Sequence, residues 1–140
     1  MLDFTINYLW VFILALVAMA FGALWYSPAF FGRPWMKLSG MADMFAEKTA
    51  EMKKKVRKGY ALGFLGTLVM FAVLDMMTTS LQAASPREGA LLGFFLWLGF
   101  VAVVALSKVL WGGESVKLWL IHIANYLVVL VVAGAVLAVV

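Results

Sequence analysis

The sequence contains no cysteine, a single histidine and only three prolines. Without cysteine, the chain has no disulfides, thiolate metal sites or cysteine nucleophiles. Charged residues are also scarce, at 13%, whereas 66% of the 140 residues are hydrophobic. An ordinary soluble domain is about half apolar and about a quarter charged. The composition therefore predicts a single integral membrane domain covering residues 1–140.

Four apolar runs are long enough to cross a bilayer. We expect membrane spans at about 4–26, 60–81, 89–110 and 116–139, because a helix needs about 20 residues to cross a hydrocarbon core about 30 Å thick. The first run lacks the basic start and small-residue cleavage site of a secretory signal, so we expect it to be retained. The sequence predicts an all-α membrane protein, a four-helix transmembrane bundle.

One long polar segment, 27–59, separates the first two spans. It holds eight basic residues and three acidic ones. Apolar residues recur within it near helical spacing, which predicts an amphipathic helix lying on the lipid headgroups: Met41, Met44, Phe45, Met52 and Val56. Anionic lipid is a simpler partner than nucleic acid, because the basic residues adjoin apolar spans. The segment is either a solvated loop that sets orientation or a dedicated docking surface.

The chain leaves the first span through a stretch rich in aromatic and turn-forming residues. Ser27-Pro28 disfavours further helix, and Gly32 permits a turn before Pro34 takes the first position of a new helix. The runs Gly-Ala-Leu-Trp-Tyr-Ser-Pro and Phe-Gly-Arg-Pro-Trp-Met resemble the signature of small bacterial membrane proteins grouped as domain of unknown function 1761. The resemblance implies four spans and no established activity. The motif residues expected at the membrane-water boundary are Trp25, Tyr26, Ser27, Pro28, Phe31, Gly32, Pro34 and Trp35.

Basic residues are distributed unevenly between the two sides that four spans define. Segment 27–59 and the connection that includes Lys108 and Lys117 together hold ten, whereas the opposite side holds only Arg87. The positive-inside rule therefore predicts a cytoplasmic basic segment and both termini outside. For a bacterial protein, this orientation corresponds to a multi-pass protein of the cytoplasmic (inner) membrane.

A polar stripe marks the outer half of the second span. Its members stand at helical spacing on one face, and Asn7 of the first span is grouped with them as a candidate intramembrane polar site: Asp75, Thr78, Thr79 and Gln82. An ionisable residue inside a span costs about 2.5–3.5 kcal/mol, so Asp75 requires a partner, water or a function. Local structural pairing and a functional role both remain open for Asp75.

A second polar cluster lies near the cytoplasmic end and comprises Lys108, His122, Asn125 and Tyr126. The last three share a face of the fourth span, where they either form interhelical hydrogen bonds or relay protons. A lone histidine with no second histidine, cysteine or nearby carboxylate is a poor metal site, so we expect no metal or other cofactor. Because Asp75 and His122 fall in opposite halves of the membrane, we expect no catalytic pair and no enzyme activity.

Two functional classes fit these features. The leading one is an interaction or scaffold protein, or an accessory subunit of a larger membrane complex. It would self-associate through small-residue helix faces at Gly59/Gly63, Gly89/Gly93 and Gly134/Ala138. The alternative is an oligomeric transporter or channel for protons or small solutes that uses the stripe around Asp75.

The predicted orientation can be tested with single cysteines, since the natural chain has none. Cysteines placed at Ser85 and Val140 should react with an impermeant thiol reagent from outside intact cells, and one at Thr49 should not, because of the asymmetry of basic residues. Labelling of Thr49 from outside, with the other two protected, would reverse the orientation.

Overall fold

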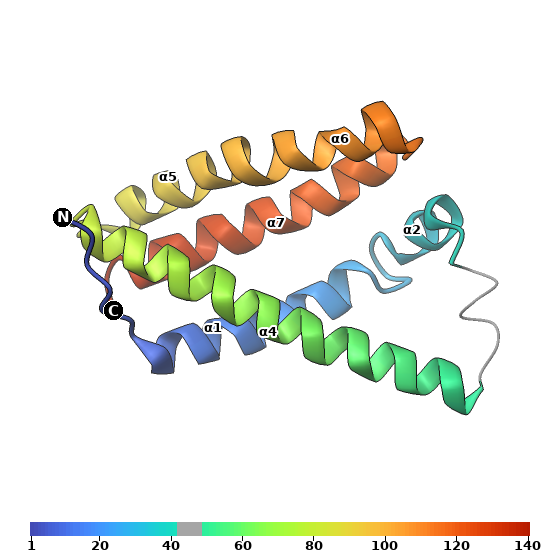
Figure 1. The fold of residues 1–140 in the computed structure, drawn as a ribbon, viewed down its shortest axis with the longest axis horizontal. Coiled ribbons are helices and arrows are strands. Elements are labelled where there is room, and N and C mark those ends of the chain that lie inside the picture. The colour runs from blue at the N-terminus through green and yellow to red at the C-terminus, as the bar shows by residue number, and fades with distance from the viewer. Residues whose placement is uncertain (42–48) are drawn as a thin grey trace.

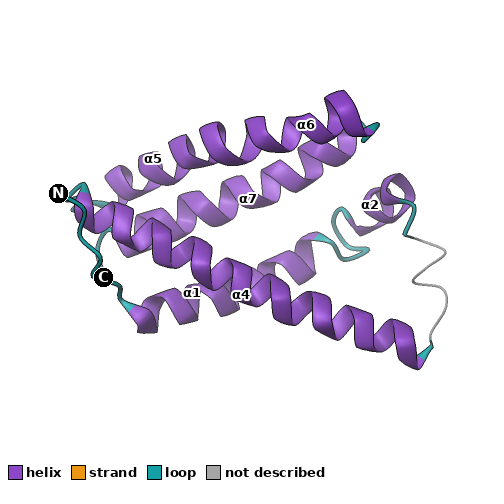
Figure 2. Cartoon of the chain, in the orientation of Figure 1, coloured by secondary structure: helices purple, strands orange, loops and turns teal. Residues whose placement is uncertain are grey.

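The computed structural model describes residues 1–41 and 49–140, which are helical and contain no strand. Met44 and Phe45 of the expected amphipathic helix lie outside these ranges. Within them, four continuous helices are long and apolar enough to cross a membrane, which confirms the all-α four-span prediction (Figure 2). In chain order the elements are α1 (Tyr8–Trp25), α2 (Gly32–Ser39), α4 (Ala50–Ser80), α5 (Pro86–Leu96), the π-helical segment η1 (Trp97–Ala102), α6 (Val103–Gly112) and α7 (Val116–Leu137).

The spans form two helical pairs (Figure 1). The continuous helix α5–η1–α6 lies along α7, and α1 lies beside α4. Both termini and the connection between α4 and α5 gather at one end, which we call the terminal end. The connection between α6 and α7 and helix α2 lie at the other, which we call the basic end. There α4 diverges from α7.

The apolar core joins α1, α4 and α7. Phe71 and Leu74 of α4 are each only 1% exposed, and they pack against residues from the other two helices. These are Val11, Leu14, Ala15, Leu130, Ala133 and Leu137. Burial of such side chains stabilises a helix pair through dispersion contacts even where lipid replaces water. The core therefore holds α4 against its neighbours in the half of α4 that approaches the terminal end.

Helices α5 and α7 approach each other through glycines. A Cβ on Gly89 would overlap the carbonyl of Gly134, and a Cβ on Gly93 would overlap the carbonyl of Leu130. The faces Gly89/Gly93 and Gly134/Ala138, expected to mediate self-association, instead pack on each other within the chain. Small residues permit this close backbone contact and its dispersion energy. By contrast, a Cβ built on Gly59 or Gly63 meets no atom of residues 1–41 or 49–140 within 4 Å.

Side-chain caps begin the second, third and fourth spans. Ser85 Oγ accepts from Glu88 N at 3.2 Å, while Glu88 Oε2 accepts from Ser85 N at 3.1 Å, completing a capping box. Thr49 Oγ1 and Ser115 Oγ accept in the same way from residues three positions ahead. These bonds satisfy amide groups that have no partner inside the helix, so local sequence determines where each helix begins.

Two local expectations are corrected. Pro34 is the third residue of α2 rather than the first. Proline is tolerated there because the first four N–H groups of a helix have no intrahelical partner, so its missing N–H costs no helical hydrogen bond. In addition, Met52 and Val56 belong to α4, which runs without a break from Ala50. They extend the second span instead of forming a separate surface helix, because the cap at Thr49 starts the helix at Ala50, ten residues before the expected start of the span.

The glycine contact predicts opposite results for two alanine substitutions. Gly93→Ala should lower the free energy of unfolding by about 1–3 kcal/mol, because its methyl group forces α5 and α7 apart. Gly66→Ala on α4, where a Cβ meets no atom within 4 Å, should raise it by about 0.5–1 kcal/mol through helix propensity. Unfolding in mixed micelles by titration with sodium dodecyl sulfate measures both. Equal effects would contradict the packing.

Candidate functional site

The turn after α1 is held by a dense set of backbone bonds. Ser27 O accepts from Phe30 N at 3.0 Å and Gly32 N at 2.9 Å, and Ser27 Oγ donates to Leu24 O at 2.6 Å. A Cβ on Gly32 would overlap the backbone of Tyr26 and Ser27. Position 32 therefore requires glycine, because any side chain there would clash with the turn. This explains why glycine occurs at this position of the motif.

Aromatic rings stack around the same turn. The ring centroids of Trp25 and Phe31 are 4.6 Å apart, and those of Tyr26 and Trp35 are 5.2 Å apart. Pairs at these distances contribute about 0.5–1.5 kcal/mol beyond the area they bury. The motif therefore positions Tyr26 and Trp35 beside α7 at the basic end.

His122 is the centre of a polar group that joins α1 to α7. The Tyr26 hydroxyl and His122 Nδ1 share a hydrogen bond of 2.7 Å. On the other side of the ring, Glu114 Oε1 lies 4.0 Å from Nε2. The expectation that His122 has no carboxylate nearby is wrong, because the connection from α6 returns Glu114 over the start of α7. Among the described residues, no group of three or more His, Asp or Glu side chains could hold a metal ion.

Three tryptophans connect the helices through their indole N–H groups. Trp25 Nε1 donates to Ile121 O at 3.1 Å, and Trp97 Nε1 donates to Ile123 O at 2.7 Å. In return, Trp119 of α7 donates to Ala102 O of η1 at 3.1 Å. A carbonyl oxygen has two lone pairs, so each acceptor serves an indole without losing its helical bond. Sequence reasoning had not identified Trp97 as a contact residue.

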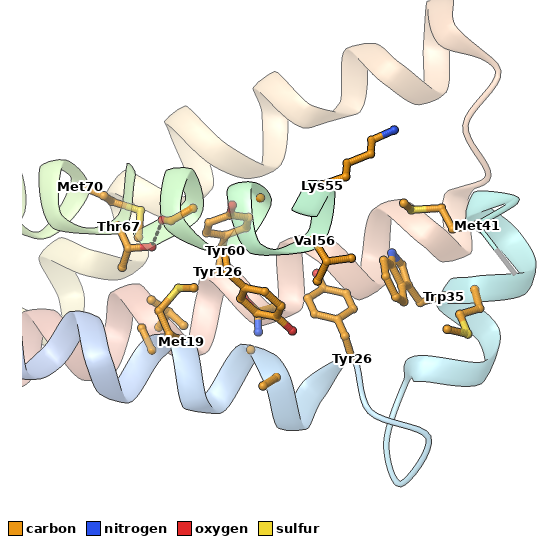
Figure 3. A pocket seen from close by; sticks show the side chains of 18 of the residues that line it. Met19, Tyr26, Trp35, Met41, Lys55, Val56, Tyr60, Thr67, Met70 and Tyr126 are labelled. Carbon is orange, nitrogen blue, oxygen red and sulfur yellow. Dashed lines mark hydrogen bonds between the residues drawn. The ribbon is translucent and has the colours of Figure 1, made fainter. Parts of the chain in front are cut away.

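An open cavity of about 600 Å³ lies where α4 diverges at the basic end. It is bounded by α1, α2, α4 and α7, and Figure 3 shows three tyrosines gathered in it: Tyr26, which follows α1, Tyr60 of α4 and Tyr126 of α7. Asn125 also lines it and is only 8% exposed, and its buried amide nitrogen has no hydrogen-bond partner among the described residues. The predicted inner cluster is thus divided: Asn125 and Tyr126 face the cavity, His122 bonds Tyr26, and Lys108 is exposed at the end of α6.

The predicted outer site assembles at the terminal end. All five of its residues line a second cavity of about 800 Å³, namely Asn7, Asp75, Thr78, Thr79 and Gln82. Asp75 is 4% exposed, and its Oδ2 accepts from the backbone N–H of Asn7 at 2.6 Å. The Thr78 hydroxyl, also buried, donates to the Asp75 carbonyl at 2.8 Å. Asp75 therefore ties the segment before α1 to the second span.

Gln82 closes α4 beside this cavity with a left-handed backbone, φ +55°. Ala83 N donates to Thr78 O at 2.9 Å and Gln82 N donates to Thr79 O at 3.0 Å, the two bonds of a Schellman cap. This conformation costs a non-glycine residue roughly 1–2 kcal/mol. The cap turns the chain sharply into the connection before α5, which helps to form the cavity wall.

The two candidate sites lie at opposite ends of the bundle. Asp75 and the Tyr26–His122 pair are separated by the apolar core around Ala15, Phe71 and Ala133. Tyr26, His122 and Glu114 follow one another at the basic end, whereas Asp75 lies at the terminal end. One cavity therefore offers a carboxylate, and the other has mostly apolar surroundings.

Four apolar helices, with polar groups paired between them, define a multi-pass α-helical membrane protein. More specifically, the chain belongs to the family described as protein of unknown function (DUF1761), whose profile matches residues 9–138. No curated protein and no solved structure matched the chain. The family assignment confirms the resemblance found around Trp25 and Trp35.

The role of Asp75 predicts different results for two substitutions. Asp75→Asn retains an oxygen that can accept from Asn7 N–H, so the free energy of unfolding should change by less than about 1 kcal/mol. Asp75→Leu leaves that N–H without an acceptor and should lower the free energy by about 1–3 kcal/mol. Micellar unfolding of both variants tests this. A large loss in the asparagine variant would show that the charge itself is required.

Proposed function

We propose that the protein is a non-enzymatic interaction protein of the bacterial inner membrane, an accessory subunit of a larger membrane complex. Its basic segment faces the cytoplasm and both termini face outward. The docking element is the first part of α4, which presents positive charge to an acidic surface of the partner.

The observation that carries this proposal is the length of α4. Its 31 residues extend for about 46 Å at about 1.5 Å per residue, whereas the hydrocarbon core is about 30 Å thick. About ten residues therefore project beyond the core as a continuation of the span. A rigid helix holds charges in fixed positions, so it is better suited to docking than a solvated loop.

The charges on this projecting helix are arranged on one side. At 100° per residue, four exposed basic residues form a continuous face about 140° wide, here called the basic face: Lys53, Lys54, Arg57 and Lys58. Opposite lie Met52, Val56 and Gly59, which line the cavity. The helix thus separates a charged exterior from an apolar interior.

We also propose that copies of the chain associate with one another. Two of the three small-residue faces pack on each other within the chain, and the third, Gly59/Gly63 on α4, lines the cavity, so a second copy would use it by packing there. A second candidate function, an oligomeric channel or transporter for protons or small solutes, is favoured by the cavity around Asp75. The bond from Asn7 to Asp75 and the apolar core beyond it favour the accessory role over permeation by a single chain.

The proposal predicts that neutralising the basic face weakens the native complex. Replacing Lys53, Lys54, Arg57 and Lys58 with glutamine removes four exposed charge contacts worth about 0.5 kcal/mol each, or about thirty-fold in affinity. Association should also weaken as salt is raised. The measurement is the mass of the complex extracted from native membranes in mild detergent, with its co-purifying proteins identified.

A matched control removes the same charge elsewhere on the same side. Arg33, Lys37, Lys108 and Lys117 replaced with glutamine should leave the complex intact, and cysteine labelling at Thr49 verifies the orientation of both variants. A strictly monomeric protein without co-purifying proteins would contradict the proposal. A proton or cation flux in liposomes that disappears in Asp75→Asn, with assembly unchanged, would favour the transporter or channel function over the accessory role.

A further inference from the structure

One carboxylate oxygen of Asp75 has no hydrogen-bond donor but is not sealed inside the protein. Oδ2 accepts from Asn7 N–H, whereas Oδ1 accepts no hydrogen bond from residues 1–41 or 49–140. In those ranges, Asn125 Nδ2 is the only fully buried side-chain nitrogen or oxygen without a partner. Oδ1 therefore keeps accessible surface on a residue that is only 4% exposed and lines the cavity at the terminal end.

The charge at the terminal end favours a cation beside this oxygen. Asn7 N–H gives Asp75 a hydrogen bond but no positive charge, and no basic side chain of the described chain forms an ion pair with it. The other charged side chains at this end are the acidic Asp3 and Glu88 and the basic Arg87. An ionisable group inside a span requires a partner, and here the missing partner is a positive charge.

Two neutral groups with acceptor oxygens lie on the wall of the same cavity. Thr79 stands one helical turn beyond Asp75, and Gln82 follows the end of α4. Both side chains are exposed, and neither forms a hydrogen bond within the described part of the chain. Together with Asp75 Oδ1 they provide three acceptors, one of them charged. A primary ammonium group has three N–H donors and no acceptor, so its bonding capacity matches this set.

A metal ion fits the cavity less well than an organic cation. Asp75 is the only charged side chain in the lining, whereas Ca²⁺ takes about six to eight oxygen ligands and Mg²⁺ requires a near-octahedral set. The volume, about 800 Å³, is within the range of about 300–1,000 Å³ that small-molecule sites occupy. Leu137, Ala138 and Val139 form an apolar part of the wall, which can receive the carbon atoms of an organic ligand.

We propose that the cavity at the terminal end binds the primary ammonium group of an organic amine. Asp75 Oδ1 supplies the counter-charge and accepts one N–H, and the oxygens of Thr79 and Gln82 accept the other two. The site lies at the opposite end of the molecule from the basic face, so it does not depend on docking to a partner complex.

The ammonium group has two possible sources, a lipid headgroup and a water-soluble amine. Asp75 lies five residues before the end of α4 at Ser80, about 7.5 Å along the helix. The headgroup region extends about 5–7.5 Å beyond the hydrocarbon core on each side, so the headgroup of phosphatidylethanolamine comes within reach of the cavity. The end of the cavity near both termini is equally close to water (Figure 1).

Two measurements on the full chain test the proposal and separate these sources. In nanodiscs of phosphatidylcholine, calorimetric titration should show that ethanolamine binds at least ten-fold more tightly than choline, which has the same charge but no N–H donors on nitrogen. In mixed detergent micelles, native mass spectrometry should show one phosphatidylethanolamine retained at least ten-fold over phosphatidylcholine. Binding in the lipid arm alone identifies the headgroup as the ligand, and binding in the ethanolamine arm alone identifies a soluble amine.

A pair of aspartates provides the matched control. Asp75→Asn keeps an acceptor for Asn7 N–H but removes the charge, and should weaken binding about ten-fold or more. Asp3→Asn makes the same change at the same end, on an exposed side chain that bonds Thr5 N and lies outside the cavity lining, and should leave binding unchanged. Thr79→Val, which preserves size on an exposed position, should weaken binding about five-fold, the effect of one hydrogen bond.

Four results would overturn the proposal. They are no binding in either arm, equal binding of the trimethylated and primary ammonium ligands, equal effects of the two aspartate substitutions, and displacement of ethanolamine by sodium at the same concentration. Micellar unfolding of each variant shows whether it is folded, and Thr79→Val tests the site independently of Asp75.

Discussion

The close contact between α5 and α7 is the constraint on which the rest of the bundle depends. At Gly89, Gly93 and Gly134 the two backbones touch where any Cβ would overlap a carbonyl. Inside a bilayer there is no hydrophobic drive between helices, so dispersion at short range has to hold them together. This contact makes the third and fourth spans a rigid hairpin, against which the first two spans must pack.

The first two spans are held to that hairpin differently at the two ends. Toward the terminal end, Phe71, Leu74 and their apolar neighbours fill the space between α1, α4 and α7. At the basic end, Trp25 and Tyr26 bind α1 to α7 through hydrogen bonds, and α4 diverges. The cavity and the projecting basic helix both result from this divergence, so both lie at one end of the molecule.

The residues of the predicted outer polar site line one cavity, and most of them lie on one helix. Spacing alone places Asp75, Thr78, Thr79 and Gln82 near one another. Asn7 joins them through its backbone N–H, a group that no side-chain pattern reveals. The inner cluster was harder to foresee, because the partners of His122 come from a turn 96 residues earlier and from the connection before α7. The methionines that line the cavity at the basic end are scattered over three regions and share no period.

The sequence by itself determined the class of protein and the existence of four apolar spans. Those features depend on composition and on contacts within a few residues, so they can be read without a fold. Only the tertiary structure decided that two glycine faces are buried against each other, and that the glycines of α4 and the amide nitrogen of Asn125 have no partner among the residues described. Each of these depends on which helices are neighbours and how closely they approach, and helix pairing inside a bilayer is determined by complementary shape rather than by hydropathy.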